Sequence, residues 1–236
     1  MTLENFKLEL RNAGDPKQAK ISSRFFKAGK GQYGEGDVFL GVKVPVQREI
    51  AKKYFHLGFE EIQELLNSKF HEERLSALII LTKQFKKAKK DKLKQRQIFE
   101  FYLKNTHRIN NWDLVDCSAP QIVGEFLKLH GTEILRELAK SESLWEKRIS
   151  IISTLSFIKE RNFGETLFLA DMLLNDEHDL IHKAVGWMLR EVGNRNKNVL
   201  DLFLLERYKK MPRTMLRYAI EKFPEEERKR YLRGKI

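Results

Sequence analysis

The segment Asn110-Asn-Trp-Asp-Leu-Val-Asp116 holds the residue types best suited to chemistry on a charged ligand. Trp112 and Asp116 are four residues apart, which places them one above the other on the same face of a helix. A ring face and a carboxylate both favour positive charge, so this pair at the bottom of a groove could hold a cationic ligand. The alternative is an ordinary helix start, with Asn111 as N-cap, Asp113 in the first turn and Trp112 in the core.

Further candidate residues come from an internal repeat. A basic residue followed by apolar and small residues recurs in amphipathic segments that begin at Arg74, Arg148, Lys183 and Arg217. The last three are 35 and 34 residues apart, and the first two are 74 residues apart, or two periods of 37, with the middle copy near Asp113. A period in the mid-thirties with two helices per unit predicts an α-solenoid of HEAT-like repeats.

The repeat predicts a shared wall, because equivalent positions of stacked repeats line one side of a superhelix. The predicted concave wall contains Trp112, Asp116, Arg148, Lys183, Trp187 and Arg190. Gly186 would keep bulk away from the Trp187 ring. Each residue alone also suits a structural role: Trp187 as core between repeats, and Arg148 as an ion-pair partner of Asp116. Together they favour a site for a charged ligand, with cations suited to a phosphate backbone.

The elements that must position these residues are almost all helical. The all-α prediction is a superhelix of HEAT-like repeats in one domain, residues 1–236, with a glycine-rich insertion at 28–44. Helical patterns cover 2–13, 16–27, 46–55, 59–66, 71–87, a segment ending near 104, 110–116, 119–129, 132–140, 143–160, 164–174, 177–193, 198–210, 213–222 and 224–232. Asp15-Pro16 is a strong helix start, and Ala119-Pro120 is interpreted as another.

The glycine-rich insertion is the one segment whose composition is not typical of a helix. Five of the 13 glycines of the chain lie between Ala28 and Gly41. No Gly-Lys-Ser/Thr sequence follows, which argues against a nucleotide-binding P-loop. The β character of residues 38–40 favours a hairpin or an extended loop. Lys30, Tyr33 and Lys43 would make it an arm that touches DNA, and an ordinary surface loop is an equal alternative.

The composition points to an anionic partner. The chain has 236 residues, a formal net charge of +12 and a sequence pI near 9.6. Nucleic acid is the leading candidate and an acidic membrane surface the second. A single cysteine excludes an internal disulfide, and neither a signal peptide nor a membrane-spanning run is present, which predicts a cytoplasmic protein. The six histidines lack partners at metal-ligand spacing, so neither metal nor cofactor is expected. A monomer is expected.

Nearly the whole chain resembles the HEAT-like-repeat alkylpurine DNA glycosylases, the AlkD family of bacterial DNA alkylation repair enzymes. The most specific matches are Trp112-Asp-Leu-Val-Asp116, Trp145-Glu-Lys-Arg148 and the segment from Lys183 to Glu191. The resemblance implies that Trp112, Asp116 and Trp187 form the catalytic cleft. It implies that Arg148 contacts double-stranded DNA beside them.

The resemblance also implies a reaction on purines alkylated at N3 or N7. Such a base is cationic and already a good leaving group, so the enzyme stabilises the oxocarbenium-like sugar and positions water. Asp116 would do both, while Trp112 and Trp187 hold the cationic nucleoside. The flanking phosphates would be held by Arg148, Lys183 and Arg190. Most glycosylases flip the base into a pocket, whereas this resemblance implies a lesion that stays stacked.

Two departures from the family pattern leave alternatives open. Phe25 stands at a DNA-contacting position where the family has a tyrosine, and the segment from Gly29 to Gly41 is longer. The resemblance also includes some relatives with an inserted hairpin that bind branched or distorted DNA in place of excising bases. The alternatives are therefore an alkylpurine glycosylase, a non-excising protein that recognises DNA structure, and a protein-binding solenoid. The net charge of +12 argues against the third.

Overall fold

The computed structural model describes residues 1–236 and is all-α, as the sequence predicts. It contains no β-strand, only one isolated parallel bridge between Val38 and Phe70. The chain forms two compact units, Met1–Ile122 and Val123–Ile236. None of its helices combines the length and the apolar character that crossing a membrane requires.

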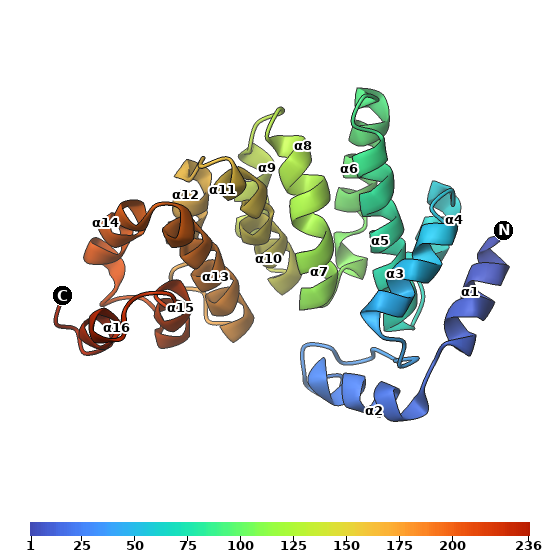
Figure 1. The fold of residues 1–236 in the computed structure, drawn as a ribbon, viewed down its shortest axis with the longest axis horizontal. Coiled ribbons are helices and arrows are strands. Elements are labelled where there is room, and N and C mark those ends of the chain that lie inside the picture. The colour runs from blue at the N-terminus through green and yellow to red at the C-terminus, as the bar shows by residue number, and fades with distance from the viewer. The chain divides into compact units, whose positions relative to one another are not determined.

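The first unit is a set of packed helices with a long buried helix at its centre. Its elements are α1 (Leu3–Asn12), α2 (Pro16–Phe25), α3 (Val44–Lys53), α4 (Phe59–Leu66), α5 (His71–Lys87), α6 (Lys92–Lys104), a short 3₁₀ turn (Thr106–Arg108) and α7 (Trp112–Ala119). Figure 1 shows α1, α3, α5 and α7 side by side, with α2 lying crosswise at one end of them. Because α5 packs on α3, α4, α6 and α7, its first eight residues are all buried.

Local signals explain most helix boundaries in this unit. Asp15 caps α2 by accepting a hydrogen bond from the Lys17 N–H at 2.9 Å, and Pro16 occupies the first helical position. Both features are typical of a helix start. The predicted ranges 59–66 and 71–87 agree with α4 and α5.

The glycine-rich segment is a loop, and the hairpin alternative is wrong. Residues 29–36 form successive turns, and an extended stretch follows. The β-prone residues pair with the chain ahead of α5: the Val38 N–H donates to the Lys69 carbonyl at 3.2 Å, and Val38 accepts from the His71 N–H at 2.9 Å. No second strand forms within the segment, because its extended backbone bonds to residues some thirty positions away.

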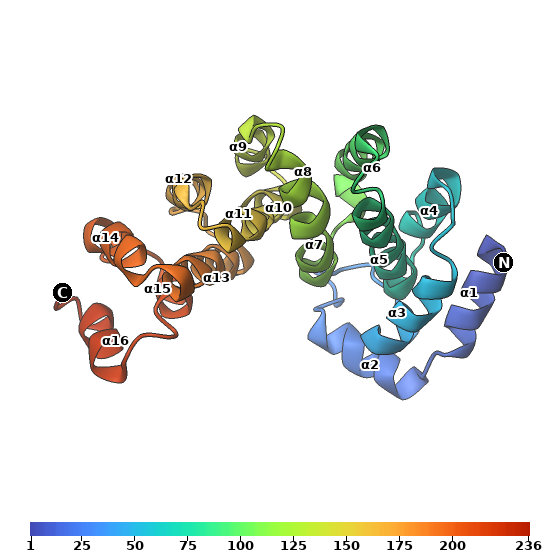
Figure 2. The ribbon, with the colours of Figure 1, turned by 45° about the horizontal axis from the view of Figure 1, so that its top comes forward.

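The second unit is also built entirely of helices. Its elements are α8 (Glu125–Leu127), α9 (Glu133–Ala139), α10 (Leu144–Ser153), α11 (Leu155–Lys159), α12 (Gly164–Met172), α13 (Asp179–Arg195), α14 (Lys197–Arg207), α15 (Arg213–Ala219) and α16 (Glu225–Leu232). Figure 2 shows α10, α13 and α15 as neighbours. These three helices carry Arg148, Lys183 and Arg217, so three copies of the sequence repeat fall in adjacent helices.

Two predicted boundaries are wrong. The chain is helical from Trp112 to Leu127, with a π-helical turn at Pro120–Gly124 in place of a new helix start at Ala119-Pro120. Pro120 has helical dihedral angles, and the wider turn accommodates a ring that lacks an N–H donor. The predicted helix 143–160 is divided at Thr154, whose hydroxyl donates to the Ile151 carbonyl at 2.7 Å.

Candidate functional site

The first turn of α7 places Trp112 and Asp116 on one helix, as the spacing predicts. The Asn111 side chain caps this helix by accepting from the Trp112 N–H at 2.9 Å. Trp112 and Asp116 are both half-buried, so each keeps an accessible edge. The predicted cap and the predicted helical pairing of the ring and the carboxylate are therefore confirmed.

A stack of aromatic rings holds Trp112 in place. Phe26 stacks on Trp112 with ring centroids 5.2 Å apart, and on His71 at 4.9 Å. Phe39 in turn stacks on Phe26, with ring centroids 5.4 Å apart, and on His71 at 4.8 Å. Phe25, at the end of α2, is 62% exposed and meets Trp112 edge-on at 5.7 Å. The Trp112 ring is thus fixed by its neighbours before any ligand arrives.

His71, the first residue of α5, lies in this stack between two carboxylates. Its Nε2 is 2.8 Å from Asp113 and its Nδ1 is 3.0 Å from Asp37. Burial opposes a charge on this ring, but the two carboxylates outweigh it and raise the pKa of His71 to about 9. His71 is therefore protonated at neutral pH and donates both ring N–H groups.

Asp37 connects the glycine-rich segment to the site. Burial alone would raise the pKa of its carboxyl, but the His71 bond and the Arg74 guanidinium, 2.5 Å away, lower it. Asn111 donates a further bond to Asp37 at 3.3 Å. The glycine-rich segment is thus fastened to α5 and α7, directly beside the Trp112 ring.

Sequence reasoning missed this cluster. Asp37, His71 and Asp113 are separated by 34 and 42 residues, so no local spacing links them. Charged residues crowded into the start of α5 were the available signal, because buried charges need partners. Both ring nitrogens of His71 are engaged by carboxylates, which makes the cluster an ion-pair network.

Glu72 fixes the extended stretch that follows Asp37. Its buried carboxylate accepts from the backbone N–H groups of Leu40, Gly41 and Val42 at 2.9, 2.8 and 3.3 Å. Gly41 has a φ of +82°, and a Cβ there would lie 2.1 Å from the Asp15 carbonyl oxygen. The absence of a side chain at Gly41 therefore allows the stretch to pass close to the start of α2, where the Asp15 N–H donates to the Leu40 carbonyl at 3.0 Å.

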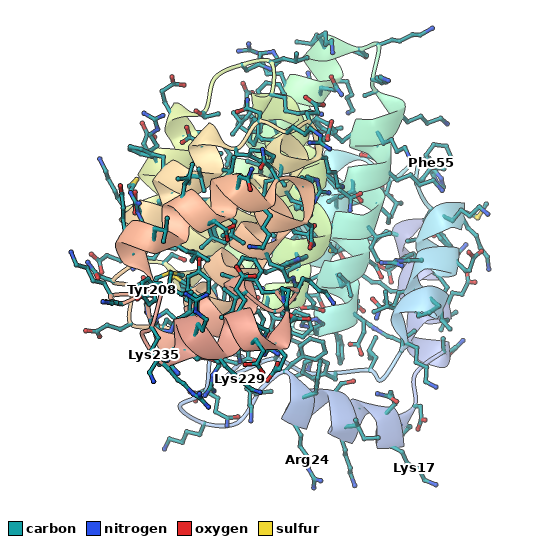
Figure 3. The ribbon with its side chains drawn as sticks, turned by 60° about the vertical axis from the view of Figure 1, so that its left-hand side comes forward. Lys17, Arg24, Phe55, Tyr208, Lys229 and Lys235 are labelled. Carbon is teal, nitrogen blue, oxygen red and sulfur yellow. The ribbon has the colours of Figure 1, made fainter.

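Exposed cations line α2 and the glycine-rich segment. Lys17, Lys20 and Arg24 follow one face of α2, and Figure 3 shows Lys17 and Arg24 pointing away from the helix into solvent. None of the three forms an ion pair, and neither do the exposed Lys30 and Lys43. We call Lys17, Lys20 and Arg24 the α2 cation row. The spacing of three and four residues between these cations is the sequence signal that marks the row.

Tyr33, predicted from the sequence as a possible DNA contact, is half-buried within the glycine-rich segment. The single cysteine, Cys117, lies on α7. Burial raises the pKa of the Cys117 thiol, which keeps it protonated and unreactive, in agreement with a packing role.

The candidate residues Arg148 and Lys183 belong to the second unit. Arg148 on α10 is buried, and its guanidinium donates to the Leu180 carbonyl at 2.7 Å. Lys183 on α13 pairs with Asp179, one turn earlier, at 2.7 Å. Arg148 therefore helps to join α10 to the start of α13.

Trp187 and Arg190 lie further along α13. Trp187 is half-buried, and Arg190 forms an ion pair with Glu221. The interpretation of Gly186 as room for a ligand at Trp187 is wrong. A Cβ at Gly186 would lie 2.5 Å from the Met215 carbonyl oxygen and 2.5 Å from the Tyr218 Cβ, so the glycine is needed where α13 packs on α15.

Comparison with known proteins supports the resemblance seen in the sequence. The model of the family described as DNA alkylation repair enzyme matches residues 6–223. Among curated proteins, no sequence matches this chain closely enough to count as a relative.

Solved structures share the fold. A protein described as a predicted DNA alkylation repair enzyme from Enterococcus faecalis has 17% identity and a TM-score of 0.68, over 90% of this chain and 97% of that one. AlkD2 from Streptococcus mutans has 16% identity and a TM-score of 0.53, over 95% of this chain and 100% of that one. At these identities the likeness concerns the fold, and it confirms the helical-repeat class. Because the family match extends over nearly the whole sequence, the chain belongs to the DNA alkylation repair enzyme family.

Proposed function

We propose that the protein is a DNA N-glycosylase that releases purines alkylated at N3 or N7 from double-stranded DNA. The observation that carries this proposal is the pairing of Trp112 and Asp116 on the first turns of α7, both partly accessible. Membership of a DNA alkylation repair family gives the pairing its substrate class.

Asp116 is proposed as the catalytic carboxylate. Alkylation at N3 or N7 makes the purine a cationic leaving group, so the reaction needs no acid to protonate it. As the glycosidic bond breaks, positive charge moves onto the sugar, and a fixed carboxylate nearby stabilises that charge. The same carboxylate can orient the water that attacks the anomeric carbon.

Trp112 is proposed to bind the cationic nucleoside. Its ring is fixed by Phe26 and Phe25, so little conformational entropy is lost when a ligand meets it. A ring held in this way attracts a cation through its π-system. In the second unit, Trp187 is proposed to contact the nucleoside in the same manner.

The phosphates are proposed to be held by cations of both units. The α2 cation row, Lys30 and Lys43 are exposed and form no ion pair, so they can meet phosphates at no internal cost. Lys183 and Arg190 are proposed to exchange their carboxylate partners for DNA phosphates. Arg148 is proposed to contact the backbone beside them.

Substitution of the proposed catalytic carboxylate tests this function. Asp116→Asn keeps the shape of the side chain and removes the charge that stabilises the sugar cation. We expect release of 7-methylguanine from methylated DNA to be lost in single-turnover assays, while affinity for the duplex stays within about twofold, since the cations proposed to hold the phosphates are unchanged.

A matched variant controls for the chemical change. Asp91 caps α6 in the same unit, and asparagine caps a helix equally well, so Asp91→Asn should retain full excision. Unchanged excision by Asp116→Asn would remove this residue from the chemistry.

A second candidate function is recognition of branched or distorted DNA without excision. The observation that favours it is the glycine-rich segment, which Asp37 fastens beside Trp112. Phe25 also supplies no hydroxyl at its exposed position next to that ring. Wild-type protein that binds a four-way junction tightly and releases no alkylpurine would favour this function over the first.

A further inference from the structure

A cleft of about 370 Å³ lies in the first unit, beside the site described above. One wall is the inner face of α2, the other is the start of α3, and α5 lies beneath. Neither Trp112 nor Asp116 lines it, although Phe25 and Phe26 line it and also contact Trp112. The cleft is large enough for a small planar ligand, and the proposed excision chemistry does not use it.

The walls of the cleft are rich in aromatic and apolar surface. Phe25, Phe26 and Phe39 contribute rings, and Ile21 and Val44 lie at its sides. Ile21 and Phe25 are 59% and 62% exposed, which is unusual for large apolar side chains that lie close together. Such a group of exposed apolar side chains indicates a surface that a ligand covers.

One buried polar atom in the cleft has no partner. Gln47 is 2% exposed, and its Nε2 donates to the Val42 carbonyl at 2.7 Å. A carbonyl oxygen only accepts hydrogen bonds, so the amide nitrogen must face Val42 and the amide orientation is fixed. The Oε1 atom is left buried without a hydrogen-bond donor. A buried acceptor of this kind destabilises the protein unless a ligand supplies an N–H or O–H group.

Two other buried polar side chains of the cleft already have partners. Glu72 accepts from three backbone N–H groups, and His71 is bonded to Asp113. Gln47 Oε1 is therefore the buried acceptor of the cleft to which a ligand could donate a hydrogen bond. Lys43 lines the cleft and is exposed, and the α2 cation row follows the adjacent face of α2. A ligand carrying phosphates would find cations on two sides of the opening.

We propose that this cleft binds one unstacked nucleobase of the bound DNA. The base would stack against the phenylalanine rings, donate an N–H of its pairing edge to Gln47 Oε1, and leave its phosphates at Lys43 and the α2 cation row. Among ligands of a basic DNA repair protein, a nucleobase alone combines a flat π-face, an N–H donor edge and flanking phosphates. The inference rests on the proposed function only in requiring DNA binding.

The base in the cleft differs from the alkylated base. The resemblance to the alkylpurine glycosylases implies a lesion that stays stacked, and in the proposed reaction water attacks its sugar. The cleft would hold an unpaired nucleotide, such as one in a bulge or one displaced opposite a damaged base. This gives the protein a way to recognise locally disrupted duplexes even without a lesion.

Binding of undamaged DNA tests the proposal without any excision step. The probes are one duplex in four forms: fully paired, with a single bulged thymine, with a bulged N3-methylthymine, and with a bulged abasic tetrahydrofuran residue. Stacking of a base and its hydrogen bond predict that the thymine bulge binds about tenfold more tightly than the abasic bulge. N3-methylthymine lacks the N–H donor and should lose most of this preference.

Two variants assign the preference to the cleft. Gln47→Leu removes the acceptor and should make the thymine and N3-methylthymine bulges bind alike. Ile21→Trp enlarges an exposed side chain at the side of the cleft, where folding is not at risk, and should abolish the preference for a base over the abasic residue. Gln97→Leu, at an exposed position of α6, is the matched control and should behave as wild type.

The outcomes separate this proposal from the proposed function. Equal affinity of the wild-type protein for thymine and abasic bulges would overturn the cleft as a base site, whatever the excision assay gives. A preference that persists in Ile21→Trp would place the base elsewhere and also overturn it. Absence of binding to every duplex would refute both the cleft proposal and DNA repair by this chain.

Discussion

His71 is the residue whose charge state depends most on the fold. It is buried, and it donates to Asp37 and Asp113. Its pKa is about 9 in the folded protein, against an ordinary value of 6.5. The folded state therefore holds a proton that the unfolded state releases between these pH values. Stability from this group is complete below pH 6.5 and is lost as the pH rises through 9, up to about 3 kcal/mol.

The pH dependence of unfolding checks this charge. We expect the urea unfolding free energy of the wild type to fall between pH 6 and pH 8.5. His71→Gln should be less stable at pH 6, because Asp113 loses its cation and Asp37 keeps only Arg74, and its stability should change little over the same interval. His107→Gln, at an exposed position, should keep the wild-type slope. A wild-type slope in His71→Gln would show that another group carries the proton.

Sequence reasoning could identify residues linked by helical spacing but not those linked by folding. Trp112 and Asp116 were found because four residues make one turn, and Asn111 because caps have a local signature. Gln47 gave no signal, because an unpartnered atom is defined by its surroundings. Asp37 gave none either, because its partner His71 lies 34 residues away.

Among the elements, α13 shows how a glycine determines helix packing. A Cβ at Gly186 would meet the backbone of α15, which cannot move as a flexible side chain can. Gly186→Ala should therefore lower the unfolding free energy by about 1–3 kcal/mol through overpacking. Gly164→Ala, at the first position of α12 with open space around it, should leave stability unchanged or slightly raised. Equal stabilities for the two variants would contradict the close approach of α13 and α15.

The start of α2 was predictable because a cap and a proline mark it, and the bounds of α4 and α5 were predictable from their helical periodicity. The π-helical turn at Pro120–Gly124 was not, because proline is equally typical of a first helical turn. The glycine-rich loop shows a similar limit. Its β-prone residues suggested a hairpin, but the partner of Val38 is Phe70, and only the fold brings the two together.

At the scale of the whole molecule, the excess of basic residues separates DNA binding from protein binding. Lys30, Lys43 and the three residues of the α2 cation row are five exposed cations of the first unit that form no ion pair. If each meets one phosphate, these five residues should contribute about −4 to −5 to the slope of the logarithm of the DNA affinity against the logarithm of the salt concentration, and the phosphate contacts proposed for the second unit should make the slope steeper. A titration by fluorescence anisotropy measures this slope.

Charge reversal along α2 tests whether the α2 cation row contributes to the salt dependence of DNA binding. The triple variant Lys17→Glu, Lys20→Glu and Arg24→Glu should reduce the magnitude of the slope by about 3, because three phosphate contacts are lost. The same reversal at Lys86, Lys89 and Lys92, exposed residues around the end of α5, is the matched control and should leave the slope nearly unchanged. Affinity that does not respond to salt would favour a protein-binding solenoid.

The carboxylate of Glu72, seated among the N–H groups of Leu40, Gly41 and Val42, has one more consequence. Three converging backbone donors form a receptor for an anion, and this protein fills that receptor with a side chain of its own. To bind there, a nucleotide phosphate would have to displace the Glu72 carboxylate, which belongs to α5. The glycine-rich stretch therefore resembles a phosphate-binding loop only in composition. Its three N–H groups already donate to Glu72 in the folded protein, so they are not available to a phosphate.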